Sequence, residues 1–310
     1  MAYRTRFGLR LPAGGSTADD GGRLARLVEL CTVAEETGFD TLWVADQPSD
    51  AEEAYTLLGA LATLTSSARL GPLVTSVGWR SPALAAKQMT TVDLLSGGRA
   101  VLGLGAGRVA GPLHESDGAP VDRFDELEDA LRICRAMFLE DSATVSGRRY
   151  QVTDAANRPR PAQPDGVPIV VGGSGEHRTL PLAVALADGC NLIGPPELLE
   201  SKLRTVRRLC ETQARDRASF SVSALVTVVV GASAGEAERR LERLALVKAP
   251  TAPLVVGEPS VVVAQVGALL ATGVDGVVLD LPDGADPHVL GALGDALGNA
   301  FGPDTERPQR

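Results

Sequence analysis

The feature that most constrains the fold is a repeated alternation along nearly the whole chain. Short apolar runs are each followed by a longer segment with the period of an amphipathic helix. This alternation is typical of a parallel sheet whose strands are joined by crossover helices. Eight runs qualify as strands: Phe7–Leu11, Thr41–Asp46, Leu70–Val77, Ala100–Ala106, Val167–Val171, Gly189–Ile193, Ser221–Val230 and Gly276–Leu281.

Eight β/α pairs favour a closed TIM-type (β/α)8 barrel, an α/β fold, over an open doubly wound sheet. The 310 residues suit either one large barrel or two average domains, and no low-complexity linker divides them. We therefore predict one barrel domain over residues 1–302 and a flexible C-terminal tail over residues 303–310. Glycines at Gly38, Gly97–Gly98 and Gly273 predict helix ends, because glycine adopts the positive φ found there.

One stretch interrupts the alternation. Between the helix ending near Leu139 and the strand at Val167, residues 144–152 predict a small hairpin, and a proline-rich run continues to Pro168. We expect a small surface insertion before strand five.

Composition excludes several partners. The net charge of −9 argues against a nucleic-acid phosphate backbone. No stretch approaches the roughly 20 apolar residues of a membrane span, and the N-terminus lacks the apolar core of a signal peptide. The four cysteines have no metal-ligand spacing and are typical of buried thiols in a reducing compartment. We expect no membrane partner and a cytoplasmic location.

In a barrel of this type the site is built from the loops that follow the strands. Asp46 ends strand two, where it could bind a ligand or cap the next helix. Strand four carries alternating glycines at Gly103, Gly105 and Gly107. This spacing lacks the third glycine of the dinucleotide fingerprint and favours instead a strand whose inward face leaves room for a ligand.

The strongest mechanistic feature follows strand five, where Gly172, Gly173, Ser174 and Gly175 open a helix. A glycine- and serine-rich turn at a helix N-terminus presents free N–H groups and the positive end of the helix dipole to an anion. The pattern favours a phosphate site, although a plain glycine-rich turn would have the same composition.

The histidines are His114, His177 and His288, and their positions predict no metal site. His114, beside Glu115 in the loop after strand four, is the histidine best placed to act as an acid or base.

Several strings together resemble the bacterial luciferase-like monooxygenase superfamily. They are AEETGFDTLWVAD over residues 34–46, RSPALAAKQM over 80–89, TVDLLSGGR over 91–99 and LGLGAG over 102–107. The strings GGSGEHRTL and ALADGCN, between Gly172 and Asn191, are similar to the actinobacterial branch of coenzyme F-420-dependent oxidoreductases. The resemblance covers about residues 6 to 298.

This resemblance implies a dimeric TIM barrel that binds a deazaflavin, coenzyme F-420, or alternatively FMN, across the strand ends. It implies that Asp46 lies near the polar edge of the ring. Ser76 and Val77 would match a bulge in strand three, often at a non-prolyl cis peptide, that backs the ring. Gly173, Ser174 and Gly175 would cradle the cofactor phosphate, in agreement with the pattern at the helix start.

Two positions depart from the family pattern. Gln47 stands where the redox enzymes of the family commonly carry histidine, and a glutamine side chain cannot titrate. Arg108 stands where Trp or Glu is common, and it could clamp an anionic group of the substrate or be a solvated rim residue. The proton would then come from His114, Glu115 or solvent.

The function that the resemblance favours is a reductase that delivers hydride from reduced F-420 to a C=C or C=N bond of a small metabolite. Two alternatives remain open. One is an FMN-dependent monooxygenase, and the other is a cofactor-binding barrel without redox activity, for which the loss of the histidine argues.

Overall fold

We describe the protein from a computed structural model. It describes residues 3–12, 22–47, 52–107, 122–245, 252–282, 284 and 286–302. The predicted tail, residues 303–310, lies outside the described residues.

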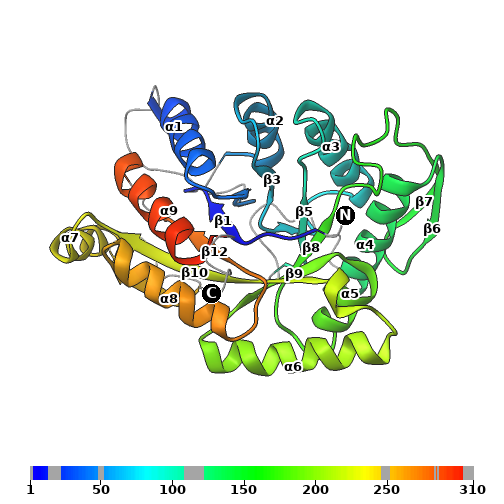
Figure 1. The fold of residues 1–310 in the computed structure, drawn as a ribbon. Coiled ribbons are helices and arrows are strands. Elements are labelled where there is room, and N and C mark those ends of the chain that lie inside the picture. The colour runs from blue at the N-terminus through cyan, green and yellow to red at the C-terminus, as the bar shows by residue number, and fades with distance from the viewer. Residues whose placement is uncertain are drawn as a thin grey trace, which may run out of the picture.

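In the described part of the chain, ten parallel strands form the central sheet (Figure 1): nine are consecutive neighbours, and the tenth, β11 (Leu254–Gly257), pairs with β10. In sheet order the neighbours run β3-β2-β1-β12-β10-β9-β8-β5-β4. The strands are β1 (Phe7–Arg10), β2 (Thr41–Val44), β3 (Arg69–Pro72), β4 (Thr75–Ser76), β5 (Leu102–Gly105), β8 (Ile169–Gly172), β9 (Gly189–Ile193), β10 (Ser221–Val230) and β12 (Gly276–Asp280).

The sheet closes on itself through the third barrel position, which β3 and β4 share. Thr75 of β4 pairs with Leu104 of β5, and Leu70 of β3 forms a parallel bridge with Ala100. β3 meanwhile pairs with β2. The predicted TIM-type barrel is therefore confirmed.

Helices follow the strands and surround the barrel (Figure 1). They are α1 (Arg23–Glu36), α2 (Ala54–Leu64), α3 (Pro82–Leu95), α4 (Arg123–Leu139), α5 (Thr179–Leu186), α6 (Pro196–Thr212), α7 (Ala234–Ala245), α8 (Pro259–Ala271) and α9 (Pro287–Phe301). Within the described ranges, no helix is long and apolar enough to cross a bilayer.

The predicted turns between helices and strands are confirmed, and the aspartates in them also accept hydrogen bonds from a neighbouring segment. Gly38 and Gly273 have φ of +92° and +96°, as expected of residues that end helices. The aspartates that follow them bind the neighbouring strand: Asp40 accepts from the Arg6 and Phe7 amides, and Asp275 accepts from the Val222 amide. Each Gly-x-Asp turn thus fixes where the next strand begins.

Strand three differs from the continuous strand predicted over Leu70–Val77. It is interrupted after Pro72, and the peptide bond between Leu73 and Val74 is cis. The expectation of a cis peptide at Ser76–Val77 is therefore wrong in its position: the bulge lies three residues earlier.

One further strand was not predicted. β11 (Leu254–Gly257) pairs in parallel with the distal part of β10, from Thr227 to Val230. β10 is ten residues long, and its near end already pairs with β9 and β12. The pairing of β10 with β9 ends at Leu225, so the residues from Thr227 onward can pair with β11.

The predicted insertion before strand five is confirmed. It contains the antiparallel hairpin of β6 (Ala143–Ser146) and β7 (Gln151–Ala155), which lies against α4 at the side of the barrel (Figure 1).

The apolar core has two parts. The larger part lies between strands and helices. The smaller part fills the barrel and contains Trp43, Val101, Val170, Leu225 and Val278. The inner cluster supports the floor of the cavity described next.

Candidate functional site

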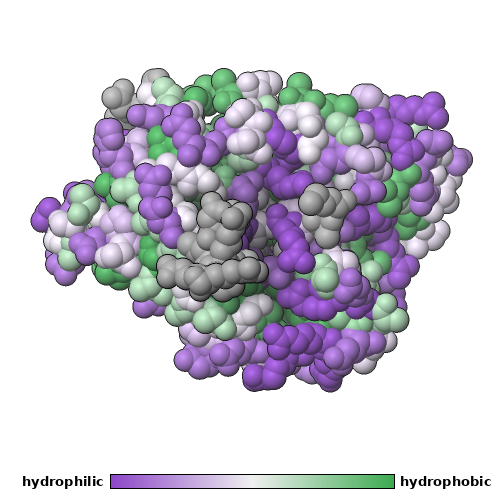
Figure 2. Space-filling view, viewed as in Figure 1, coloured by the Kyte–Doolittle hydropathy of each residue, from purple (hydrophilic) through white to green (hydrophobic). Residues whose placement is uncertain are grey.

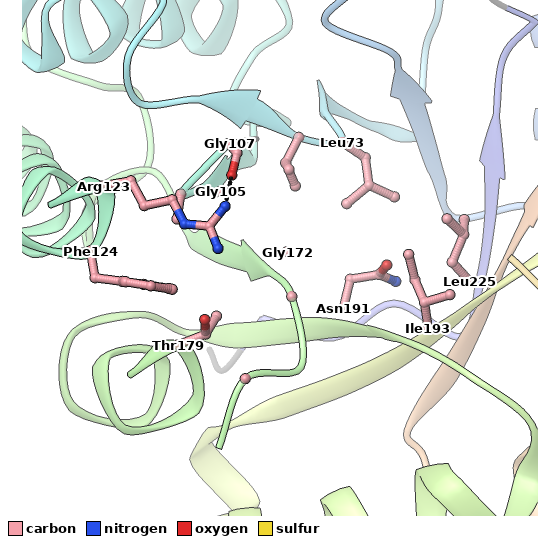
Figure 3. A pocket seen from close by; sticks show the side chains of 14 residues that line it. Leu73, Gly105, Gly107, Arg123, Phe124, Gly172, Thr179, Asn191, Ile193 and Leu225 are labelled. Atoms are coloured by element: carbon pink, nitrogen blue, oxygen red, sulfur yellow. Dashed lines mark hydrogen bonds between the residues drawn. The ribbon is translucent and has the colours of Figure 1, made fainter. Parts of the chain in front are cut away.

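A cavity of about 400 Å³ opens at the carboxyl ends of the strands (Figure 3). This is the end of a (β/α)8 barrel at which active sites form. Its lining comes from four strands, β5, β8, β9 and β10, from the segment between β3 and β4, from the loops after β5 and β8, and from the starts of α4 and α5. The lining residues are Leu73, Val74, Gly105, Ala106, Gly107, Arg123, Phe124, Gly172, Gly173, Gly175, Thr179, Asn191, Ile193 and Leu225.

Val74 occupies a space that glycines leave open. A Cβ built on Gly105 would lie 2.7 Å from a Val74 methyl, and one on Gly172 would lie 2.8 Å from the other. A Cβ on Gly103 would lie 2.0 Å from the Pro72 carbonyl oxygen. The glycines therefore make room first for the bulge of strand three, which then presents Leu73 and Val74 to the cavity.

Gly107 likewise leaves space for a side chain of strand three, that of Ser76. Its φ is +73°, and a Cβ there would meet the Ser76 hydroxyl oxygen at 2.0 Å. The expectation that the alternating glycines leave space for a ligand needs this correction: Gly105 and Gly107 line the cavity, but the side chains that need their space belong to the protein.

The loop from Gly172 to Gly175 forms one wall and leads into α5. Gly173 has φ of +134° and donates its amide to the Asn191 carbonyl at 3.2 Å. A Cβ on Gly175 would lie 3.0 Å from Thr179 Oγ1, so the loop is packed closely on the first residue of the helix. No side chain caps α5. This arrangement suits an anion at the helix start.

Two arginines lie against the ring of Phe124, which lines the cavity from the start of α4. The guanidinium carbons of Arg123 and Arg178 lie 4.9 Å and 5.4 Å from the centre of the Phe124 ring. Arg123 donates to the Gly107 carbonyl at 2.9 Å (Figure 3), and Arg178 pairs with Asp122 and Asp125. Arg123 is the one ionisable side chain in the described lining. Arg123 therefore brings one positive charge to the cavity, whereas the charge of Arg178 is compensated by its two aspartate partners.

Asn191 is the buried polar group deepest in the cavity wall. It is 3% exposed, and its amide nitrogen donates to Ser223 Oγ at 2.9 Å. Its side chain points into the cavity between Thr179 and Ile193 (Figure 3). This contact fixes the orientation of the amide.

Asp46 lies outside the cavity lining, in a buried network. Its carboxylate accepts from Thr75 Oγ1 at 2.7 Å and from Arg80 Nη2 at 3.0 Å. Burial, the largest effect, raises the pKa of this carboxyl above its ordinary value, and Arg80 and Thr75 oppose that rise. Arg80 also lies over the Tyr55 ring at 4.1 Å. Asp46 does not cap the next helix, because Glu53 does.

The other predicted site residues divide into three groups. Gly105, Gly107, Gly172, Gly173 and Gly175 line one cavity, as predicted for a cofactor site. Ser76, Val77 and Ser174 adjoin it without lining it, and Gln47 is exposed at the end of strand two. Arg108, His114 and Glu115 lie outside the described residues.

Sequence analysis missed Leu73, Val74, Asn191 and the Phe124 wall. Asn191 carries a usable signal, since a polar residue in a buried strand points to an inward position at a ligand site. The Phe124 wall carries none, because Arg123 and Phe124 read as an ordinary helix start. In the described part of the chain, no three His, Cys, Asp or Glu side chains gather as metal ligands.

The fold and cavity define a (β/α)8-barrel protein with a glycine-walled, cofactor-sized site at its strand ends. The family follows from comparison: the chain belongs to the luciferase-like monooxygenase family, whose model matches residues 5–254.

Two curated relatives are similar to part of this chain. The chain is 32% identical to an F-420-dependent glucose-6-phosphate dehydrogenase of Amycolatopsis mediterranei over 158 residues, which is 47% of each protein. It is 33% identical to a 5,10-methylenetetrahydromethanopterin reductase of Archaeoglobus fulgidus over 51% of this chain and 46% of that protein. The chain thus spans about half the length of the curated relatives it matches.

A solved structure supports the fold. The F-420-dependent tetrahydromethanopterin reductase of Methanopyrus kandleri superposes with a TM-score of 0.82 at 20% identity, over 96% of this chain and 100% of that chain.

Proposed function

We propose that this protein is an F-420-dependent oxidoreductase that transfers hydride between the deazaflavin and a small metabolite, reducing a C=C or C=N bond. The observation that carries the proposal is the cavity, in which the Leu73–Val74 bulge faces the Gly172–Gly175 loop. The F-420-dependent dehydrogenase and the F-420-dependent reductase structure named above support this choice of cofactor.

The residues present fit such a cofactor. Leu73 and Val74 would contact the ring, and the loop from Gly173 to Gly175 would hold the phosphate at the start of α5. Arg123 adds positive charge to the lining. When bound, the deazaflavin supplies the hydride, and the protein supplies orientation and the proton.

Gln47 cannot titrate, so the proton must come from another group. We propose His114 or Glu115 for proton transfer, Gln47 as a hydrogen-bonding neighbour, and Arg108 as a clamp for the substrate. Asp46, Ser76 and Val77 are proposed to support the cofactor from outside the lining.

The assembly and location are proposed with it. Leu64 of α2 and Leu84, Leu94 and Leu95 of α3 are between 39% and 51% exposed, which supports a homodimer through these helices. Four free cysteines, all buried, fit the reducing cytoplasm.

The test is fluorescence titration of the purified protein with F-420 and, separately, with FMN. We expect saturable binding of F-420 with a dissociation constant in the low micromolar range, on the order of −8 kcal/mol. Substitution Gly175→Val should weaken it, because the added atoms would meet Thr179. The matched control is Gly59→Ala, since a Cβ on Gly59 meets nothing within 4 Å.

Selective binding of FMN would instead support the monooxygenase. Binding of F-420 without turnover on unsaturated substrates would support the barrel without redox activity. Binding of neither cofactor would refute the proposal.

A further inference from the structure

One polar side chain of the cavity lining stands on a barrel strand. The described lining contains three polar side chains, and two of them, Arg123 and Thr179, stand at the starts of helices. The third, Asn191, belongs to β9 and is in register with Gly172 of β8 on one side and with Ser223 of β10 on the other. Asn191 is therefore the polar side chain that the barrel wall itself offers to a ligand.

The surroundings of the Asn191 amide are apolar. In Figure 3 the amide points toward Ile193 and Leu225, which line the same cavity. Leu73 and Val74 of the strand-three bulge also belong to this lining. In such surroundings a polar atom without a hydrogen-bond partner is costly, and a ligand that supplies the partner gains accordingly.

The protein uses only part of the hydrogen-bonding capacity of Asn191, which is 3% exposed. Its Nδ2 donates to Ser223 Oγ at 2.9 Å. Its Oδ1 accepts no hydrogen bond from the described part of the chain, yet it is not among the side-chain atoms that are closed off from solvent. Because Asn191 lines the cavity, the cavity is where a ligand can reach this oxygen.

A second buried asparagine provides a comparison. Asn157 is 2% exposed, and its Nδ2 donates to both Thr90 Oγ1 and the Met137 carbonyl, which ties α3 and α4 together. Its Oδ1 also has no partner but is closed off from solvent, so a ligand has no access to it. Asn191 bonds through its side chain to one other side chain and keeps an accessible oxygen, so packing alone does not explain an amide at this position.

The chemistry of the free oxygen decides which group could bind. A carboxamide oxygen accepts hydrogen bonds and donates none. An ionised carboxylate has no hydrogen to give it, and a cationic donor would find no carboxylate in the described lining to compensate its charge. The group that suits this oxygen is an uncharged O–H or N–H.

We propose that Asn191 is a specificity-determining residue that binds an uncharged hydroxyl or N–H group of the substrate through Oδ1, and that Ser223 positions the amide for this contact. The inference rests on the proposed function, because it names a group that the substrate of that reaction would carry. A substrate without this group leaves the amide oxygen desolvated and unpaired, so the site discriminates against it.

Phenol and anisole test the contact, because they share a ring and differ in whether the oxygen carries a hydrogen. Both are uncharged at pH 7. Ligand-detected NMR titrations should show phenol binding about fivefold more tightly than anisole, the effect of one hydrogen bond. The titrations are made with and without saturating F-420, and we expect the preference in both.

Asn191→Leu is the decisive variant, since leucine keeps the approximate size of the side chain and has no acceptor. We expect it to bind phenol and anisole equally. Ser223→Ala leaves the lining residues in place and removes the group that orients the amide, so the preference for phenol should fall to about twofold. The matched control is Asn299→Leu at an exposed position of α9, outside the cavity, which should keep the wild-type preference.

F-420 binding, followed by the fluorescence of the cofactor itself, separates this inference from the proposed function. Asn191→Leu should bind F-420 as tightly as the wild type does. Absence of a preference for phenol in the wild type, a preference that survives in Asn191→Leu, or one that disappears when F-420 is bound would each overturn the inference. So would weakened F-420 binding in Asn191→Leu, because the amide would then contact the cofactor. A wild-type protein that binds no F-420 would refute the proposed function, whatever the two probes show.

Discussion

Val74 is the side chain on which the shape of the cavity most depends. It contacts the positions where side chains would stand on Gly105 and Gly172, on two neighbouring strands. Its own position is fixed by the interruption of strand three between Pro72 and Thr75. In this part of the lining, any side chain larger than that of glycine at Gly105 or Gly172 would displace Val74.

A methyl group added at Gly105 tests this dependence. In Gly105→Ala the new atom would lie 2.7 Å from a Val74 methyl, so Val74 must move into the cavity. We expect F-420 binding to weaken about tenfold and the free energy of unfolding to fall by about 1–3 kcal/mol, the cost of overpacking. Fluorescence titration and urea denaturation measure the two effects.

The control for this substitution is Gly59→Ala in α2, where the new methyl group meets nothing. Here we expect unchanged F-420 binding and a gain in stability of about 0.5–1 kcal/mol from helix propensity. Unchanged F-420 binding in Gly105→Ala would show that the bulge does not shape the cofactor site.

Individual residues were the hardest scale to predict from the sequence. The glycines of strand four were found, because alternating glycines in a strand are unusual. What they accommodate was not, because it depends on where strand three is interrupted, which was expected at Ser76–Val77 and lies between Pro72 and Thr75. Arg123 and Phe124 approach the glycine loop only when the barrel is closed.

At the scale of elements, carboxylates connect helices to strands. Glu35, near the end of α1, accepts hydrogen bonds from the amides of Ser66, Ser67 and Ala68, just before β3. Burial, the largest single effect, would raise the pKa of this carboxyl, but the three amides together outweigh it and the pKa is lowered. The ionised form thus holds the start of β3 against α1.

The sign of the pH effect follows from the lowered pKa. A carboxyl whose pKa is lower in the folded state contributes stability above its unfolded pKa, and this contribution is lost as the pH falls through the folded value. Glu35→Gln should reduce the free energy of unfolding at pH 7 by about 1 kcal/mol, since an amide accepts more weakly than a carboxylate.

The difference between wild type and Glu35→Gln should shrink as the pH is lowered from 7 toward 3. Urea midpoints at each pH measure it. A control is Glu36→Gln, one residue further along α1. A difference between wild type and Glu35→Gln that stays constant with pH would mean that the charge of Glu35 does not matter to the fold.

Elements were predicted well where the periodicity was long. The eight barrel strands and the inserted hairpin follow from apolar runs of adequate length and from the glycines between them. β11 was missed because it is additional to the eight barrel strands and pairs with the distal end of β10, a contact that no local sequence pattern marks. Likewise, no local sequence pattern indicates which strands pair to close the barrel.

At the scale of the whole molecule, the surface over α2 and α3 carries hydrophobic residues. Figure 2 shows hydrophobic side chains along the edge of the molecule where these helices lie. Leu84 and Leu95 of α3 are 51% and 50% exposed, and Leu64 of α2 is 46% exposed. Clustered exposed leucines on neighbouring helices are typical of a surface that another protein covers.

The proposed homodimer makes a definite prediction about mass. Light scattering coupled to size exclusion should give about twice the chain mass of 32.2 kDa at micromolar concentration. In the double variant Leu84→Glu, Leu95→Glu, each charge would be buried twice in a two-fold interface, so we expect the mass of one chain. Val261→Glu on α8 is the control, because Val261 is also 41% exposed but lies on a different helix. It should leave the dimer intact. A wild-type protein with the mass of one chain would contradict the homodimer, and loss of the dimer in Val261→Glu would move the interface to α8.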